Sequence, residues 1–173
     1  MPPASSWVMR HLDFVPAGSA VLDLAAGSGR HVRLCRRAGL AVIAVDRDTA
    51  GLNAFADDGG VEIMAADLEA AAWPLAGRRF GGVIVTNYLW RLLLPEVIAA
   101  VAPGGVLIYE TFAAGNEAFG RPRNPDFLLR PNELLEAVGT ELEVLDYRHG
   151  FEPGPQPAVR QKIAARRPDM DRP

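Results

Sequence analysis

The sequence contains very little cysteine: Cys35 is the only one in 173 residues. A single thiol excludes a disulfide within this sequence and a cluster of thiolate metal ligands, and it fits the reducing cytoplasm. Cys35 stands between Leu34 and Arg36 in a helix-like segment. We therefore expect it to be a small core residue rather than a nucleophile.

Long apolar runs are also absent from the sequence. No stretch reaches the roughly 18 consecutive apolar residues that suggest a membrane span, and residues 1–10 lack the apolar segment of a signal peptide. We therefore expect a cytoplasmic protein that makes no use of a membrane.

The sequence also lacks a surplus of basic residues. The formal net charge is −3, whereas proteins that rely on phosphate contacts usually carry a basic excess, so nucleic acid is not favoured as a partner. Seventeen of the eighteen basic residues are Arg, and Lys162 is the only Lys. Because this bias runs through the whole chain, a single arginine is a weak signal by itself.

The composition that remains is typical of a globular protein, with 49% hydrophobic and 23% charged residues. The chain is long enough for one proper core and too short for two ordinary domains. We expect one domain over residues 1–173, with its core at about 20–165 and a frayed tail at 166–173.

Short apolar runs alternate with helix-like segments along the chain. The strand candidates are residues 20–24, 41–45, 61–64, 82–85 and 105–109, and the helix candidates between them are 30–38, 48–57 and 95–101. Several runs are apolar at consecutive positions, which is typical of strands buried on both faces of a parallel sheet. The alternation predicts an α/β fold with a doubly wound, mostly parallel sheet.

The last third of the sequence changes character. Residues 113–131 form a 19-residue stretch rich in Gly, Pro and Asn, and loops of this length are often lids or binding loops. A short helix at 132–138 and strand candidates at 142–148 and 158–164 follow. The prolines between the two strands favour an antiparallel hairpin at the sheet edge, which completes seven strands.

A turn of very small residues follows the first strand. The run Asp23-Leu24-Ala25-Ala26-Gly27-Ser28-Gly29 leads straight into a helix. Small side chains let the backbone approach a ligand closely, and the helix N-terminus adds free N–H groups. Open α/β sheets bind ligands at this place, although a loop that is glycine-rich only for tight packing would look the same.

Acidic residues follow the next two strands as well. Asp46 ends the second strand, nineteen positions after Gly27, where a carboxylate can accept both hydroxyls of a ribose. Asp67 ends the third strand and is placed to accept from an adenine amino group. Each carboxylate alone is ordinarily a helix cap or a surface group. Together with Asp23, they indicate a nucleoside site at one sheet edge.

The pattern resembles the class I S-adenosylmethionine-dependent methyltransferases over about residues 20–165. Their first motif, acidic-x-Gly-x-Gly-x-Gly, is matched by residues 23–29 with Ala25 in place of the first Gly. The resemblance implies a Rossmann-like methyltransferase fold and S-adenosyl-L-methionine as cofactor. The residues that it assigns to the cofactor are Asp23, Leu24, Ala25, Ala26, Gly27, Ser28, Gly29, Asp46, Arg47, Asp67, Leu68 and Asn87.

Methyl transfer from such a donor is an in-line displacement that needs alignment more than acid–base chemistry, so we expect no catalytic triad. Tyr88, Arg91 and Glu110 are candidates for catalytic roles. Trp7 and Arg10, on an expected N-terminal helix, would close the substrate cleft at the carboxyl ends of the strands. With no inserted domain, the acceptor is expected to be a small molecule, and the sequence does not identify it.

Alternative interpretations concern the same turn and the helix after it. His31 could approach the donor, although a solvent-facing or capping histidine is the commoner arrangement. A nicotinamide-dependent oxidoreductase is the main alternative, but the third glycine of its G-x-G-x-x-G motif would fall at Val32. A non-catalytic nucleoside-binding protein of the same fold is another alternative, suggested by Ala25. An RNA methyltransferase would need a positive surface.

Overall fold

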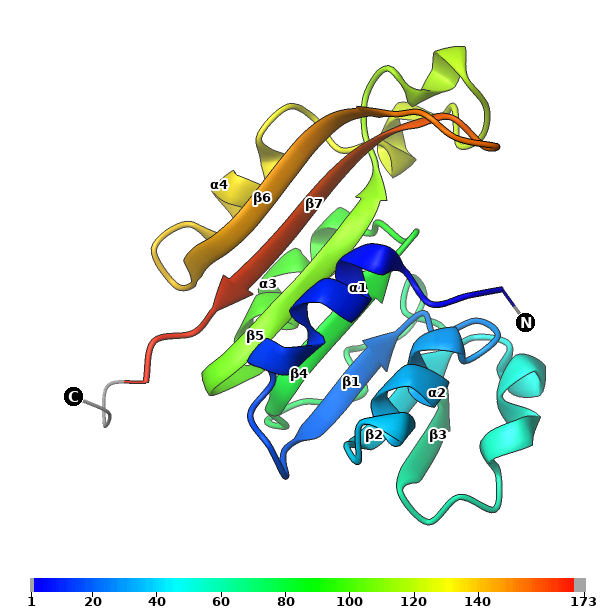
Figure 1. Ribbon diagram of the computed structural model, residues 1–173, viewed down its shortest axis with the longest axis vertical. Coiled ribbons are helices and arrows are strands. Elements are labelled where there is room, and N and C mark those ends of the chain that lie inside the picture. Colours follow the sequence, from blue (N-terminus) through cyan, green and yellow to red (C-terminus); the bar gives the residue numbers. More distant parts are fainter. Residues whose placement is uncertain (1, 170–173) are drawn as a thin grey trace.

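Seven strands form one sheet in the computed structural model, which describes residues 2–169 (Figure 1). The spatial order is β3-β2-β1-β4-β5-β7-β6. The bounds are β1 (Ala20–Leu24), β2 (Ala41–Asp46), β3 (Val61–Ala65), β4 (Phe80–Thr86), β5 (Val101–Phe112), β6 (Glu143–Glu152) and β7 (Ala158–Arg166). The first five strands pair in parallel, and β7 lies antiparallel between β5 and β6. The predicted doubly wound sheet with an antiparallel hairpin is confirmed.

Helices cover both faces of this sheet. The α1 (Ser6–His11) and α2 (Arg30–Arg37) helices lie on one face, and α3 (Leu94–Ala99) and α4 (Glu133–Val138) lie on the other (Figure 1). Two buried apolar clusters follow from this arrangement, one on each face of the sheet. The central strand β4 is buried at every position, which explains why its sequence does not alternate and carries no polar side chain before Thr86, its last residue.

The α2 helix shows how the amphipathic pattern positions an element. Val32 and Cys35 are fully buried against the sheet, whereas Arg33 and Arg37 are exposed. Gly39 follows the helix with a left-handed φ of 76°, a conformation that ends helices. The expectation that Cys35 is a core residue is confirmed, and burial raises the pKa of its thiol to about 12.

Two predicted helices differ from the structure. Residues 48–57 do not form an α-helix; they contain a run of 3-10 turns at Thr49–Phe55, which packs against the glycine-rich turn. A Cβ at Gly51 would lie 2.6 Å from the carbonyl oxygen of Gly27, so the backbones of the two segments are in close contact at this point. The helix predicted at 95–101 ends at Ala99, because Val101 already pairs with Phe80 as the first residue of β5.

The long segment 113–131 contains only short 3-10 turns, at Asn116–Ala118 and Pro125–Phe127. It is nevertheless tied to the body of the protein. Buried Asn116 accepts a hydrogen bond from Val159 N (3.1 Å), and Arg91 donates to the carbonyl oxygen of Leu128 (2.7 Å). These bonds fix the loop at both ends of its course. Within residues 2–169 there is no helix with the length and hydropathy needed to cross a membrane.

Candidate functional site

Three adjoining hollows lie at the carboxyl ends of the parallel strands, where the strand order reverses between β1 and β4. Ligands bind at this switch point in open α/β sheets. The volumes are about 280, 300 and 220 Å³, and Tyr88 lines all three. We call them the acidic hollow, with Asp46 and Asp67; the loop hollow, with Gly27 and Ser28; and the outer hollow, with Phe112 and Phe127.

The glycine-rich turn owes its shape to left-handed backbone conformations. The φ angles are 55° at Ala25, 56° at Gly27 and 73° at Gly29. A Cβ at Gly27 would meet nothing within 4 Å, so this residue leaves open space, whereas a Cβ at Gly29 would lie 2.5 Å from the Phe55 ring. Gly29 therefore serves packing. Ala25 adopts the left-handed conformation without being glycine, so its presence does not disrupt the turn.

Asp46 ties the turn to the end of β2. One carboxylate oxygen accepts from Gly27 N at 2.7 Å, and the other accepts from Asp48 N at 3.0 Å. Asp67, at the end of β3, accepts from Glu69 N at 3.0 Å. Asp46 and Asp67 line the same hollow. Their remaining lone pairs are available to hydroxyl or amino donors of a ligand, because a carboxylate accepts about four hydrogen bonds.

The third acidic residue, Asp23, does not reach any hollow. It is 1% exposed, its Oδ2 has no hydrogen-bond partner among residues 2–169, and its Oδ1 lies 3.9 Å from Nδ1 of His31. Burial raises the pKa of Asp23 to about 7, against the opposing effect of the nearby Arg30 guanidinium. The carboxyl group is therefore held behind the ligand surface.

His31 is buried rather than solvent-facing. Its Nε2 accepts a hydrogen bond from Ser5 N at 3.2 Å, which ties the segment before α1 to the start of α2. Burial lowers the pKa of His31 to about 4, so the ring is neutral at physiological pH. Arg30 reinforces the same link by donating to the Pro3 carbonyl at 3.3 Å. The N-terminal segment therefore borders the loop hollow, which Pro2 lines.

Tyr88 is the residue on which the three hollows converge. Its hydroxyl is buried and has no hydrogen-bond partner in the described part of the chain, and its carbonyl accepts from the Tyr109 hydroxyl at 2.7 Å. Burial, and then the carboxylates of Glu69 and Asp67, raise the pKa of Tyr88 to about 12. The phenol thus stays protonated at neutral pH. It can donate a hydrogen bond or form a wall, and it is a poor candidate for a general base.

The other two catalytic candidates lie away from the hollows. Arg91 forms a double hydrogen bond to Glu133, with Nε–Oε1 at 2.6 Å and Nη2–Oε2 at 3.0 Å, and the pair fixes the loop before α4. Glu110 is buried, and its carboxylate lies 3.2 Å from Lys162 Nζ. Neither side chain lines the acidic, loop or outer hollow, because each is turned toward a partner elsewhere.

The structure brings most of the predicted cofactor residues together. Those that line the hollows are Ala25, Ala26, Gly27, Ser28, Asp46, Arg47, Asp67, Leu68 and Asn87. Asp23, Leu24 and Gly29 lie behind this surface. Sequence reasoning missed Arg30 and Glu69, which also line the hollows. Of these, Arg30 had a signal, because it is the first residue of the helix after the turn.

Among the described residues 2–169, no group of three His, Cys, Asp or Glu side chains is arranged to hold a metal ion. The hollows are instead lined by the turn, by the guanidinium groups of Arg30 and Arg47, and by the carboxylates of Asp46, Asp67 and Glu69. This set fits a nucleoside joined to a charged tail, because the carboxylates suit the hydroxyls and amino groups of a nucleoside and the guanidinium groups suit an anionic end.

The fold is that of solved S-adenosylmethionine-dependent methyltransferases. No protein-family model and no curated protein matches the sequence. TehB from Haemophilus influenzae is 19% identical, with a TM-score of 0.71 over 93% of this chain and 61% of that one, so this chain spans less than two thirds of TehB. The glycopeptide N-methyltransferase MtfA, solved with S-adenosyl-L-methionine, is 20% identical, with a TM-score of 0.62 over 95% and 93%.

A third similar structure is the 1,6-didemethyltoxoflavin-N1-methyltransferase of Burkholderia thailandensis, solved with its substrate and S-adenosylhomocysteine. It is 18% identical, with a TM-score of 0.68 over 94% of this chain and 76% of that one. At these identities the likeness concerns the fold, and the chemistry has to be argued from the residues of this chain.

Proposed function

We propose that this protein is an S-adenosylmethionine-dependent methyltransferase that acts on a small-molecule acceptor. The observation that carries the proposal is the joining of two features at the switch point. The left-handed turn at residues 25–29 opens onto the loop hollow, and Asp46 connects this turn to the acidic hollow where Asp67 lies. The fold supports the same class of reaction.

The residues present fit the proposed cofactor. Asp46 would accept the ribose hydroxyls, and Asp67 with Leu68 would hold the adenine. Arg30, together with Ser28 of the turn, would hold the methionine carboxylate, because both residues carry donors and line the loop hollow. When bound, the cofactor supplies a methyl group made electrophilic by its sulfonium.

The contribution of the protein to the reaction is positioning and exclusion of water. Tyr88 stays protonated and forms the wall shared by the three hollows. The outer hollow, with Leu89, Phe112 and Phe127 among its walls, is the place where an acceptor would meet the donor. Alignment of two reactants can supply about 7–11 kcal/mol in favourable cases, so no general base is required.

Calorimetric titration with S-adenosylhomocysteine tests the donor site. We expect saturable binding by the wild type and a loss of about 5- to 150-fold in affinity for Asp46→Ala, equivalent to about 1–3 kcal/mol for a charged hydrogen-bonding group. Asp57→Ala, which removes an exposed carboxylate just beyond the 3-10 turns, is the matched control and should leave the affinity unchanged.

The nicotinamide alternative is tested in the same titration with NADH. Val32, where that motif needs a third glycine, is fully buried between α2 and the sheet. Binding of NADH without binding of S-adenosylhomocysteine would overturn the proposed function. Incubation with labelled donor and a metabolite extract then tests catalysis, and a binding protein without activity would give no labelled product.

A further inference from the structure

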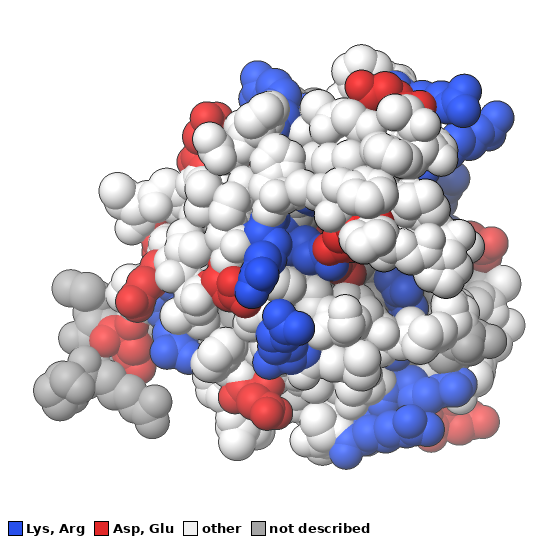
Figure 2. Space-filling model, turned by 45° about the horizontal axis from the view of Figure 1, so that its top comes forward, with Lys and Arg blue, Asp and Glu red and all other residues white. Residues whose placement is uncertain are grey.

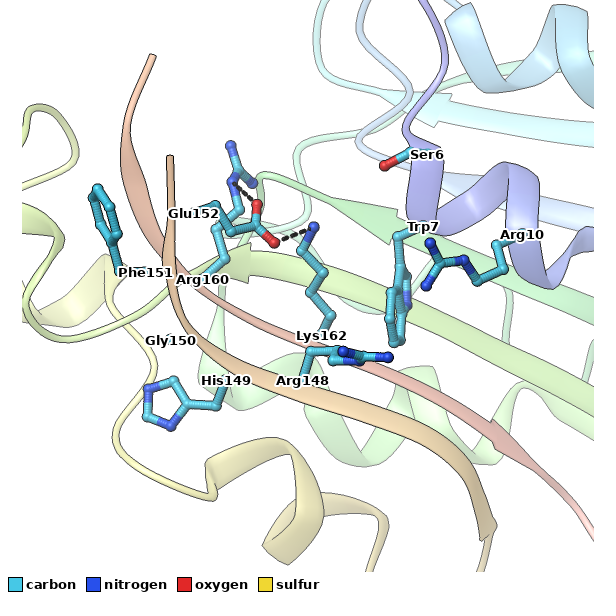
Figure 3. Close-up of a pocket in the computed structure, with 10 residues that line it drawn as sticks. All are labelled: Ser6, Trp7, Arg10, Arg148, His149, Gly150, Phe151, Glu152, Arg160 and Lys162. Atoms are coloured by element: carbon cyan, nitrogen blue, oxygen red, sulfur yellow. Dashed lines mark ion pairs between the residues drawn. The ribbon is translucent and has the colours of Figure 1, made fainter. Parts of the chain in front are cut away.

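A second cleft lies beside the three hollows, between α1 and the hairpin of β6 and β7. Its volume is about 380 Å³, and four cationic side chains line it: Arg10, Arg148, Arg160 and Lys162 (Figure 3). Glu152 is the acidic residue among the lining side chains. We call this space the basic cleft. Figure 2 shows basic side chains gathered beside a hollow near the middle of this face, with acidic ones between them.

The positive charge of the cleft is only partly neutralised within the protein. Lys162 Nζ lies 2.6 Å from Glu152 Oε1 and 3.2 Å from Glu110 Oε2, and Arg160 Nε lies 3.8 Å from Glu152 Oε2. Glu152 thus serves two cations at once, and its side chain is 43% exposed. A ligand anion entering the cleft would compete with Glu152 for both cations, while Glu110 stays paired with Lys162.

The remaining two cations are more available. Arg148 Nε lies 3.7 Å from Asp146 Oδ1, but Asp146 also receives a hydrogen bond from Nε2 of His11 at 3.1 Å. Arg10 is exposed and forms no ion pair with any residue in the part of the chain that the structure describes. Because the whole chain carries a net charge of −3, this local excess of cations runs against the overall charge.

One wall of the cleft is rigid and apolar. Trp7 is 4% exposed, its indole N–H donates to the Ile163 carbonyl at 3.2 Å, and Lys162 Nζ lies 5.9 Å from its ring centre. In Figure 3 the side chains of Trp7, Arg10 and Lys162 face one space, whereas His149 points away from it. The cleft therefore offers cations beside a fixed aromatic surface, a combination suited to an anionic organic molecule.

Arg160 connects the basic cleft to the proposed donor site. Its Nη1 donates to Asn87 Oδ1 at 2.6 Å, and its guanidinium lies 4.1 Å from the ring centre of Phe112. Asn87 lines both the loop hollow and the outer hollow, and Phe112 lines the outer hollow. A molecule whose anionic group lay in the basic cleft would therefore have its other end directed along Arg160 toward the donor site.

We propose that the basic cleft binds the anionic group, a carboxylate or a phosphate, of the methyl acceptor. This inference rests on the proposed function for the identity of the ligand as an acceptor. The shared chemistry of the two groups is an oxyanion that accepts hydrogen bonds from arginine and lysine. The acceptor class is thus a small anionic molecule.

Anion binding is measured directly by NMR, with the indole N–H signal of Trp7 as reporter. Inorganic phosphate and succinate are titrated separately, with chloride keeping the ionic strength constant. We expect the Trp7 signal, assigned with Trp7→Phe, to shift saturably with at least one anion. The stronger of the two anions assigns the chemistry of the group. An unchanged signal with both anions would overturn the proposal.

Matched variants separate the cleft from general charge effects. Arg10→Gln/Arg148→Gln should weaken anion binding at least about fivefold, the loss expected when about 1 kcal/mol of charged hydrogen bonding is removed. Arg33→Gln/Arg37→Gln removes the same charge from the exposed side of α2 and should leave it unchanged. Equal weakening in both pairs, or in neither, would overturn the proposal.

Glu152→Gln should have the opposite effect on anion binding. Removing the competing carboxylate should tighten anion binding about two- to tenfold, and weaker binding would contradict the role assigned to Glu152. Titration of the wild type with S-adenosylhomocysteine is done on the same sample. Donor binding without anion binding refutes the basic cleft alone, whereas anion binding without donor binding refutes the proposed function and leaves the cleft as an anion site.

Discussion

The two halves of the sheet differ in how their functional residues are assembled. In the half formed by β1, β2 and β3, the residues of the proposed donor site are at strand ends and in one short turn, so neighbouring positions in the sequence lie together. In the half formed by β5, β7 and β6, the basic cleft combines α1 with a hairpin from the far end of the chain. Motifs mark the first kind of site, and only the tertiary fold produces the second.

The strongest test of the first half concerns the two glycines of the turn, Gly27 and Gly29. Gly29→Val should lower the free energy of unfolding by about 2–4 kcal/mol, because overpacking against Phe55 adds to the strain of a left-handed φ. Gly27→Ala should lower it by only about 1 kcal/mol, because open space surrounds that position. Urea unfolding measures both.

Gly18→Ala is the control for this comparison. Gly18 lies far from the turn, its φ is 76°, and a Cβ there would meet nothing within 4 Å. Its effect should equal that of Gly27→Ala on stability, while only Gly27→Ala should alter the affinity for S-adenosylhomocysteine. Equal stability losses at Gly27 and Gly29 would refute the separation of a packing glycine from a lining glycine.

The second half is tested first at the link between the loop and α4. Arg91→Gln should lower the free energy of unfolding by about 1–3 kcal/mol, because it leaves the buried Glu133 carboxylate without its double hydrogen bond. It should also expose residues 113–131 to proteolysis, because the carbonyls of Asp126 and Leu128 lose their donor. Urea unfolding and limited proteolysis measure the two effects.

Glu133→Gln, in contrast, removes the charge and keeps most of the shape, so it should be less destabilising than Arg91→Gln. If residues 113–131 are cleaved at the same rate in the wild type and in Arg91→Gln, the hydrogen bonds of Arg91 do not hold this loop in place.

The buried Asp23 predicts a specific pH dependence in the first half. Since its pKa is raised to about 7 in the folded protein, from 3.8, its contribution to stability is fully present below pH 3.8 and is lost as the pH rises to about 7. Asp23→Asn cannot lose a proton. Its free energy of unfolding relative to the wild type should therefore rise by about 1–3 kcal/mol between pH 4 and pH 8.

His31 acts in the opposite direction over part of this range, because its lowered pKa of about 4 removes stability as the pH falls below 6.5. The difference between Asp23→Asn and the wild type isolates Asp23 from this effect as long as the two groups titrate independently. A difference that stays flat from pH 4 to pH 8, measured by urea unfolding, would show that Asp23 has an ordinary pKa.

The smallest expected effect concerns the basic cleft. Glu152→Gln should change the free energy of unfolding by less than about 0.5 kcal/mol, because the Glu152 side chain is 43% exposed and the buried Lys162 keeps its ion pair with Glu110. The same substitution is expected to tighten anion binding, so the cleft would be a binding feature rather than a stabilising one. A loss of more than about 1 kcal/mol in thermal or urea unfolding would assign Glu152 a structural role instead.

The sequence predicted the fold because strand burial and turn composition are local signals. Strand β4 is apolar at consecutive positions and is buried on both faces, and the helix predicted at 30–38 is found at Arg30–Arg37. The helix expected at 48–57 was wrong, because Gly51 packs against the backbone of Gly27 and the segment forms 3-10 turns. That contact joins elements that are separate in the sequence.

The candidate site was predicted where the chain itself places the residues together. Asp46 and Asp67 line one hollow because adjacent parallel strands end at the same edge. The sequence did not show which strand residues point into the hollows and which point into the core. Asp23 was expected at the site, but its side chain is buried behind the surface of the hollows. Arg160 and Lys162 gave no signal, because their role depends on β7 lying between β5 and β6.

The hydrogen bond from Gly27 N to Asp46 has a kinetic consequence. The turn is held in its left-handed shape by a carboxylate of the protein itself, so an arriving ligand finds the turn already ordered. Little conformational entropy then remains to be lost on association. The association rate of the ligand should accordingly be limited by diffusion into the loop hollow. Differences in affinity between ligands should then come from their dissociation rates.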